Sequence, residues 1–147
     1  MLNIENYLAG PLENGFATGL NFIQNHTAPL NSVNATATLT AAQVATGYIT
    51  CTSTSAVTMT LPTGTLLGAY LGAAQGTTLN FIIDNTASSS SGTVTVAVAV
   101  NGILSAAAAA GSGAGAGLLT VPVGVTGIGE FEIIFSSPTA YVFSRVA

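Results

Sequence analysis

The sequence predicts an all-β protein, a jelly-roll-like β-sandwich of about eight strands with one short helix and an irregular N-terminal arm. Two observations predict this fold. From Asn34 onward, apolar residues alternate with threonine, alanine or acidic residues, a period typical of strands with one face in a core. The 147 residues fit a single domain that can bury such a core. We therefore divide the chain into an arm, residues 1–33, and a β-sandwich domain, residues 34–147.

The arm differs from the rest of the chain in composition. It is rich in Asn and Gly, and Pro11 and Pro29 interrupt it. Its scattered apolar residues are the candidate interface of the chain: Phe16, Leu20, Phe22 and Ile23. Two interpretations stay open, because such a segment either lies across a neighbouring subunit or is a frayed terminus.

Strands are expected wherever the alternation is clear or β-branched and aromatic residues cluster. These stretches are residues 35–39, 48–51, 57–61, 79–84, 94–100, 118–123, 130–135 and 141–146. Pro122 has no N–H to donate to a ladder, so its strand lies at an edge or is bulged there. Cys51 is the only cysteine, which excludes an intrachain disulfide and favours a small buried hydrophobe.

Helical segments are short. The spacing of Thr40 and Gln43 is that of a capping box and predicts a single turn before Gly47. After Pro62, residues 65–74 predict the short helix, a lid against the sandwich. Its apolar face is expected to consist of four residues: Leu66, Leu67, Tyr70 and Leu71.

Two segments are predicted to be loops. The serine-rich residues 88–92 predict a flexible hairpin loop. Residues 106–117 contain only Ala, Gly and Ser, which indicates a mobile loop or, alternatively, close packing between chains.

Charged residues are scarce, at 4% of the chain against about 25% in an ordinary domain. There is no lysine, and Arg145 and His26 are the basic side chains; the acids are Glu5, Glu13, Asp84, Glu130 and Glu132. Phosphate binding needs several cations, so nucleic acid and anionic membrane surfaces are excluded as principal partners. Neither a signal peptide nor about twenty strongly apolar residues in a row is found, which argues against a membrane segment.

So little charge leaves a free protein with weak self-repulsion and a poor solubility margin. We infer that much of the surface is covered, by copies of the chain or by a larger assembly. The alternative is a monomer that its many Thr, Ser and Asn side chains keep in solution.

The sequence indicates no enzyme and no cofactor. Residues 111–116 fit a relaxed dinucleotide-binding pattern, but they follow an alanine run and lack a βαβ unit. A hydrolytic triad would need His26 as its base, but the chain has no nucleophile-elbow sequence. One His with one Cys cannot build a zinc site. Glu130 and Glu132 have the spacing of a carboxylate pair. A simpler interpretation is that they face solvent or pair with Arg145 across strands.

Several short motifs resemble capsid-associated proteins of tailed bacteriophages. These motifs are Leu-Thr-Ala-Ala-Gln at residues 39–43, Met-Thr-Leu-Pro-Thr at 59–63, Phe-Ile-Ile-Asp-Asn-Thr at 81–86 and Tyr-Val-Phe-Ser-Arg at 141–145. The likeness covers residues 34–147 and leaves the arm out. It implies a jelly-roll-like capsid decoration (cement) protein that binds the outer face of the major capsid protein, and it implies no catalytic residues.

The expected function is therefore a structural virion protein, a homo-oligomeric decoration subunit that stabilises the bacteriophage capsid. We expect a homotrimer rather than a homodimer, located on the outer capsid surface after synthesis in the host cytoplasm. A glycan- or receptor-binding module at the tip of a head fibre or adhesin is the alternative. A third candidate is the cap of a bacterial surface filament. A coiled-coil or collagen-like stalk would favour it, and the sequence contains neither pattern.

Overall fold

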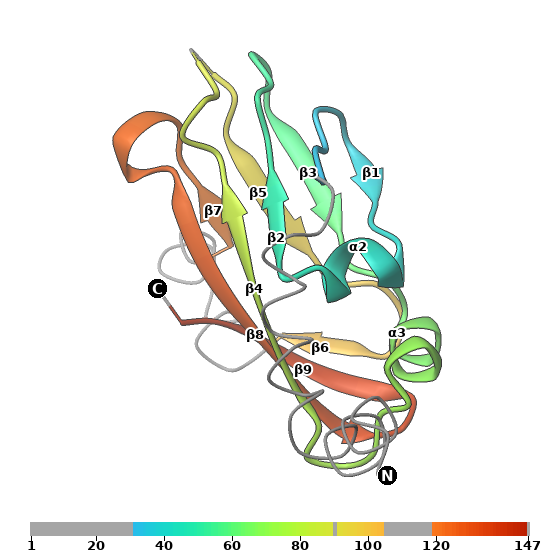
Figure 1. Cartoon of the computed structure of the whole chain (residues 1–147). Helices are drawn as coiled ribbons and strands as arrows, with labels where there is room; N and C mark the ends of the chain where they lie inside the picture. Colours follow the sequence, from blue (N-terminus) through green and yellow to red (C-terminus); the bar gives the residue numbers. More distant parts are fainter. Residues whose placement is uncertain (1–30, 90, 105–118, 147) are drawn as a thin grey trace, which may run out of the picture.

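The computed structural model describes residues 31–89, 91–104 and 119–146, which form two β-sheets packed around one apolar core (Figure 1). One sheet has four strands and the other has five, so the β-rich class is confirmed. The candidate interface residues Phe16, Leu20, Phe22 and Ile23 lie outside the described residues, as does the low-complexity segment 106–117.

The four-stranded sheet has the order β1-β3-β5-β7, with β1 (Ala37–Thr38), β3 (Val57–Thr60), β5 (Val94–Ala97) and β7 (Thr120–Val121). The five-stranded sheet has the order β2-β4-β8-β9-β6, with β2 (Tyr48–Thr50), β4 (Thr78–Asp84), β8 (Ile128–Ser137), β9 (Ala140–Arg145) and β6 (Gly102–Leu104). Within the described residues, three helical segments connect strands: α2 (Ala41–Ala45), α3 (Gly64–Leu71) and the 3-10 helix η2 (Gly124–Thr126).

The chain winds between the two sheets. From β1 to β8, each strand lies in the sheet opposite to the strand before it. Four of the pairs therefore join strands that are two apart in the sequence: β1·β3, β2·β4 and β3·β5 are parallel and β5·β7 is antiparallel. β6 pairs in parallel with β9. A jelly roll is built from antiparallel strands. The sandwich is confirmed, but the antiparallel pairing of a jelly roll is not.

The period of two correctly predicts most of the core. Val57, Met59 and Leu61 from the four-stranded sheet each expose 3% or less of their surface. From the other sheet, three phenylalanine rings stack with centroids 5.3–6.2 Å apart: Phe81, Phe131 and Phe143. Each such buried ring contributes about 1.5–3 kcal/mol to stability. The predicted strand 94–100 ends at Ala97, and Val100 is exposed.

The capping box that begins α2 is confirmed. The Thr40 hydroxyl accepts the backbone N–H of Gln43, and the Gln43 side chain accepts the backbone N–H of Thr40. The Gln43 amide also donates to the side chain of Asn31 over 3.2 Å, and Asn31 donates back to the Gln43 carbonyl over 3.0 Å. These bonds fix the chain before β1 against α2.

Helix α3 packs through only part of the predicted face, where Leu71 lies half-buried against the core. Leu67 is buried, but Leu66 and Tyr70 are 62% and 59% exposed. The face that packs is made by Gly64 and Gly68, where an added Cβ would lie only 2.3 Å and 1.9 Å from backbone oxygens of the β8–β9 turn. The turn therefore contacts helix backbone, and the larger side chains are turned outward.

The segment 88–92 also differs from the prediction, because β4 and β5 lie in different sheets and the loop is not a hairpin. Ser88 is buried, and its hydroxyl donates to the carbonyl oxygen of Cys51 over 3.1 Å. Gly92 is buried too. An added Cβ there would lie 2.1 Å from the carbonyl oxygen of Ser53, so the backbone of the loop packs directly on the backbone of Ser53. Side-chain and backbone contacts thus anchor both ends of the loop.

Two smaller predictions are confirmed. Cys51 is fully buried directly after β2, and Pro122 follows β7, the edge strand of the four-stranded sheet. Within the described ranges, no helix has the length and apolar character needed to span a membrane.

Candidate functional site

The outer face of the four-stranded sheet is a regular array of hydroxyl groups. Its residues alternate with core residues and are cross-strand neighbours, Thr58 with Thr95 and Thr120 in one row and Thr38 with Thr60 and Ala97 in the next. We call this set the threonine face: Thr38, Thr58, Thr60, Thr95, Ala97 and Thr120. None of its side chains is charged, so a partner could cover it without removing an ion from water.

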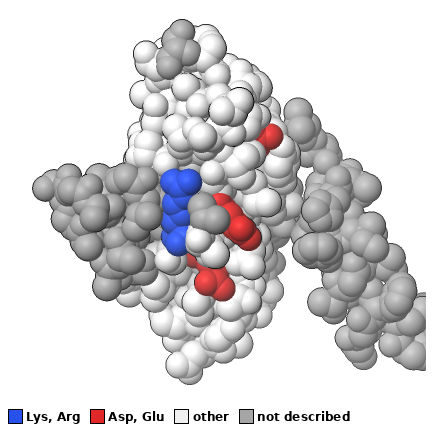
Figure 2. Space-filling model, turned by 90° about the vertical axis from the view of Figure 1, so that its left-hand side faces the viewer, with Lys and Arg blue, Asp and Glu red and all other residues white. Residues whose placement is uncertain are grey.

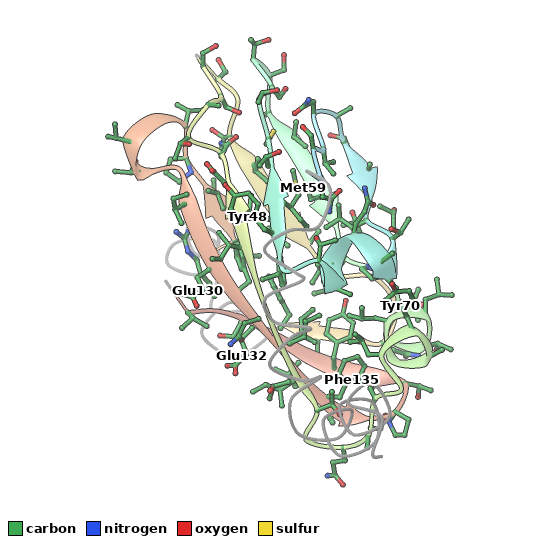
Figure 3. The ribbon with its side chains drawn as sticks, in the orientation of Figure 1. Tyr48, Met59, Tyr70, Glu130, Glu132 and Phe135 are labelled. Carbon is green, nitrogen blue, oxygen red and sulfur yellow. The ribbon has the colours of Figure 1, made fainter. Side chains whose placement is uncertain are left out.

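The outer face of the five-stranded sheet carries every carboxylate side chain of the described residues: Asp84, Glu130 and Glu132. We call the following set the acidic face: Tyr48, Asn80, Ile82, Asp84, Glu130 and Glu132. In the register, Ile82 lies between Tyr48 and Glu130, and Asn80 pairs with Glu132. Glu130 and Glu132 project from the same side of β8 (Figure 3).

Asp84 is held by three hydrogen bonds. The Tyr48 hydroxyl donates to one carboxylate oxygen, and the backbone N–H and the hydroxyl of Thr86 donate to the other over 2.9 Å and 2.6 Å. Partial burial alone would raise the pKa of Asp84, but the bonds from Thr86 and Tyr48 outweigh it and lower the pKa. The same bond to Asp84, with desolvation, raises the pKa of Tyr48.

This cluster was not predicted. Asp84 and Thr86 are two positions apart at the end of a strand, the spacing at which an aspartate side chain accepts a backbone N–H two residues on. That spacing was a usable sequence signal for the turn. The contribution of Tyr48 had no such signal, because it depends on the parallel pairing of β2 with β4.

Arg145 leaves β9 on the core side of the five-stranded sheet, whereas Glu130 and Glu132 leave β8 on the outer side. Its register partner is Phe131, a core residue, and the guanidinium lies 5.8 Å from the centre of that ring. It donates to the carbonyl oxygens of Thr120, over 2.7 Å, and of Ile128, over 3.4 Å. These bonds link the two sheets at one end of the sandwich. In Figure 2 its blue atoms and the red acids stand out from an otherwise uncharged surface.

Beside the acidic face, three aliphatic residues are aligned across neighbouring strands. The register pairs Ile134 of β8 with Val142 of β9, and Val142 with Ile103 of β6. Ile134 and Ile103 are 40% and 55% exposed. We call Ile103, Val142 and Ile134 the apolar row. It ends at β6, the edge strand of the sheet.

The remaining sequence candidates are placed as follows. His26 lies outside the described residues. In the ranges 31–89, 91–104 and 119–146, no three His, Cys, Asp or Glu side chains gather in a way that could hold a metal ion. Comparisons with known proteins found no matching family model, curated protein or solved structure.

Proposed function

We propose that the chain is a structural virion protein, a decoration subunit that docks on the outer surface of a tailed-bacteriophage capsid. The observation that carries the proposal is the threonine face, a sheet surface with hydroxyl and methyl groups and no charge. The motifs that resemble capsid-associated proteins supply the identity of the partner, the major capsid protein. The proposal includes a homotrimer on the particle rather than a homodimer.

The physical case rests on the low cost of covering such a surface. Burying an unpaired ion costs several kcal/mol, whereas a hydroxyl can exchange water for a protein acceptor at little cost. Threonine methyl groups add apolar area to the contact. Each contact is weak, but many copies on one shell together resist the pressure inside it through avidity.

The test is sedimentation of phage particles with the purified chain. We expect high-copy binding that persists from about 0.1 to 1 M NaCl, because screening weakens only charged contacts. Thr95→Lys, which places a cation on the threonine face, should abolish binding, and Thr65→Lys on the exposed side of α3 should not. Loss of the wild-type chain at high salt, or equal binding of the two variants, would contradict the proposal.

The second candidate is a glycan- or receptor-binding module at the tip of a head fibre or adhesin. One observation favours it: Tyr48 is 38% exposed and shares the acidic face with the exposed Asn80 and with Asp84. An aromatic ring beside amide and carboxylate groups can stack on a sugar and bind its hydroxyls. On a glycan array, Tyr48→Ala should then lose binding that Tyr70→Ala, another exposed tyrosine, keeps. An array on which the wild-type chain binds nothing would exclude this candidate.

A further inference from the structure

The apolar row is the part of the five-stranded sheet that most needs a cover. Ile103, Val142 and Ile134 are cross-strand neighbours, so their exposed carbons form one continuous strip over three strands. An exposed strip of this kind in a chain with 4% charged residues favours aggregation unless something covers it. The question is which segment does so.

The acidic face argues against a second copy packed through the same surface. In a symmetric dimer formed there, Asp84, Glu130 and Glu132 of one chain would lie close to those of the other. Like charges brought together in this way oppose association. An occupant without acids fits better.

The N-terminal arm enters the structure at this sheet. The Thr50 N–H donates to the carbonyl oxygen of Asn31 and the Val33 N–H donates to that of Thr50, both over 2.9 Å. Ser32 forms a parallel bridge with Thr50. The chain before Asn31 therefore starts from the β2 edge of the sheet whose opposite edge is β6.

The arm has the length to cross the sheet. Asn31 lies one spacing outside β2 and Val142 lies on β9, so four strand spacings, about 19 Å, separate them across the sheet. The register also places Val142 about five residues, or about 17 Å, further along the strands, which makes about 26 Å in all. Phe22 precedes Asn31 by nine residues, or about 30 Å of extended chain. The arm also has the composition, because residues 14–30 contain no Asp, Glu, Lys or Arg and include Phe16, Leu20, Phe22 and Ile23.

Because the arm enters at the β2 edge, is long enough to reach the apolar row and has no charged residue in 14–30, we propose a docking site for it. Residues 16–23 of the same chain dock across the outer face of the five-stranded sheet. Phe22 covers the apolar row, and the arm acts as a strap that crosses the sheet from the β2 edge toward the β6 edge. The strap is independent of capsid binding, since it forms within one chain.

Disulfide trapping tests the strap directly. In a Cys51→Ala background, Phe22→Cys with Val142→Cys should cross-link within one chain under mild oxidation, seen as a monomer with a loop on non-reducing gels. The matched control is Phe22→Cys with Thr95→Cys on the threonine face, which should cross-link at least tenfold less. Equal yields for the two pairs would overturn the proposal. A cross-link found only in dimers would also overturn it and assign the arm to a neighbouring subunit.

A second measurement needs no cross-link. Phe22→Asp with Ile23→Asp should release the strap and raise the fluorescence of an added hydrophobic dye several-fold, with the circular dichroism of the sheets unchanged. Tyr7→Asp with Leu8→Asp, in the earlier part of the arm, should leave the fluorescence at the wild-type level. Unchanged fluorescence in the first variant, or an equal rise in both, would show that these residues do not cover the row.

Discussion

The hydroxyl of Tyr141 donates a hydrogen bond of 2.9 Å to the carbonyl oxygen of Pro62, 79 positions earlier in the chain. The ring is fully buried, stands edge-on to Phe135 and contacts the site where an added Cβ on Gly102 would lie. This one side chain therefore connects β9 to the residues that precede α3 and to β6.

Tyr141→Phe should destabilise the protein by about 1–2 kcal/mol, because the carbonyl oxygen of Pro62 then stays buried without its donor. Urea denaturation measures the change. Tyr70→Phe is the matched control, since Tyr70 is 59% exposed. Burial raises the pKa of Tyr141, so the hydroxyl stays protonated and able to donate its hydrogen bond under the conditions of urea denaturation. Equal midpoints for the two variants would show that the buried bond contributes nothing.

Asn85 offers a sharper test. Its buried side-chain amide donates to the carbonyl oxygens of Gly92, Val121 and Pro122 over 2.8–3.2 Å. Asn85→Asp replaces that donor with a carboxylate facing three acceptors, and we expect a loss of about 3 kcal/mol or more in the free energy of unfolding.

The control for Asn85→Asp is Asn34→Asp, because the side chain of Asn34 uses its amide oxygen as an acceptor. Asn34 accepts the backbone N–H of Thr52 over 2.8 Å through its side-chain oxygen, and a carboxylate can accept it as well. Asn34→Asp should therefore stay within about 0.5 kcal/mol of wild type. A comparable loss in both variants would argue against the donor role of Asn85.

Gly68→Ala should be destabilising although alanine is the better helix former. An added Cβ would lie 1.9 Å from the carbonyl oxygen of Pro138 and 3.2 Å from the ring of Phe135. We expect a cost of about 2 kcal/mol or more, as in other overpacked cores. Thr65→Ala on the exposed side of the same helix should be neutral or slightly stabilising. Thermal melting of both variants would decide, and a stable Gly68→Ala protein would mean that the β8–β9 turn can move away.

The hydrogen bonds to Asp84 predict a pH dependence at the acid end. Because folding lowers the pKa of this carboxyl, the charged form stabilises the native state above the unfolded pKa, near 3.8, and this contribution disappears as the pH falls through the folded value. Asp84→Asn should flatten the decline of the denaturation midpoint below that pH. Its effect is expected to be modest, since the group lies near solvent. An unchanged acid slope in Asp84→Asn would contradict the assignment.

Local patterns predicted what depends on local chemistry. The alternation in Val57, Met59 and Leu61 identified core positions, and Thr40 with Gln43 identified a helix start. The errors arose where distant segments decide the outcome. Leu66 and Tyr70 are exposed because the β8–β9 turn contacts two helix glycines, which no helical periodicity reveals.

The candidate site shows the same division. That Thr58 and Thr95 face solvent follows from their apolar neighbours, but their place in one row follows from the parallel pairing of β3 and β5. The position of Arg145 over the ring of Phe131 depends on the register of β8 and β9. Pairing between strands that are not consecutive is the information that a period of two does not contain.

The winding of the chain between two sheets also determines how it folds. Of the seven strand pairings in the part of the chain that the structure describes, only β8·β9 joins consecutively numbered strands. Every other pairing must close a longer loop first, which places the chain among the slow, millisecond-to-second folders. Because β8 and β9 occupy the middle of the five-stranded sheet, a growing polypeptide cannot complete that sheet until residue 145 has left the ribosome. Until then, one edge of β4 and both edges of β6 lack a strand partner, and unpaired edges of this kind are prone to aggregation.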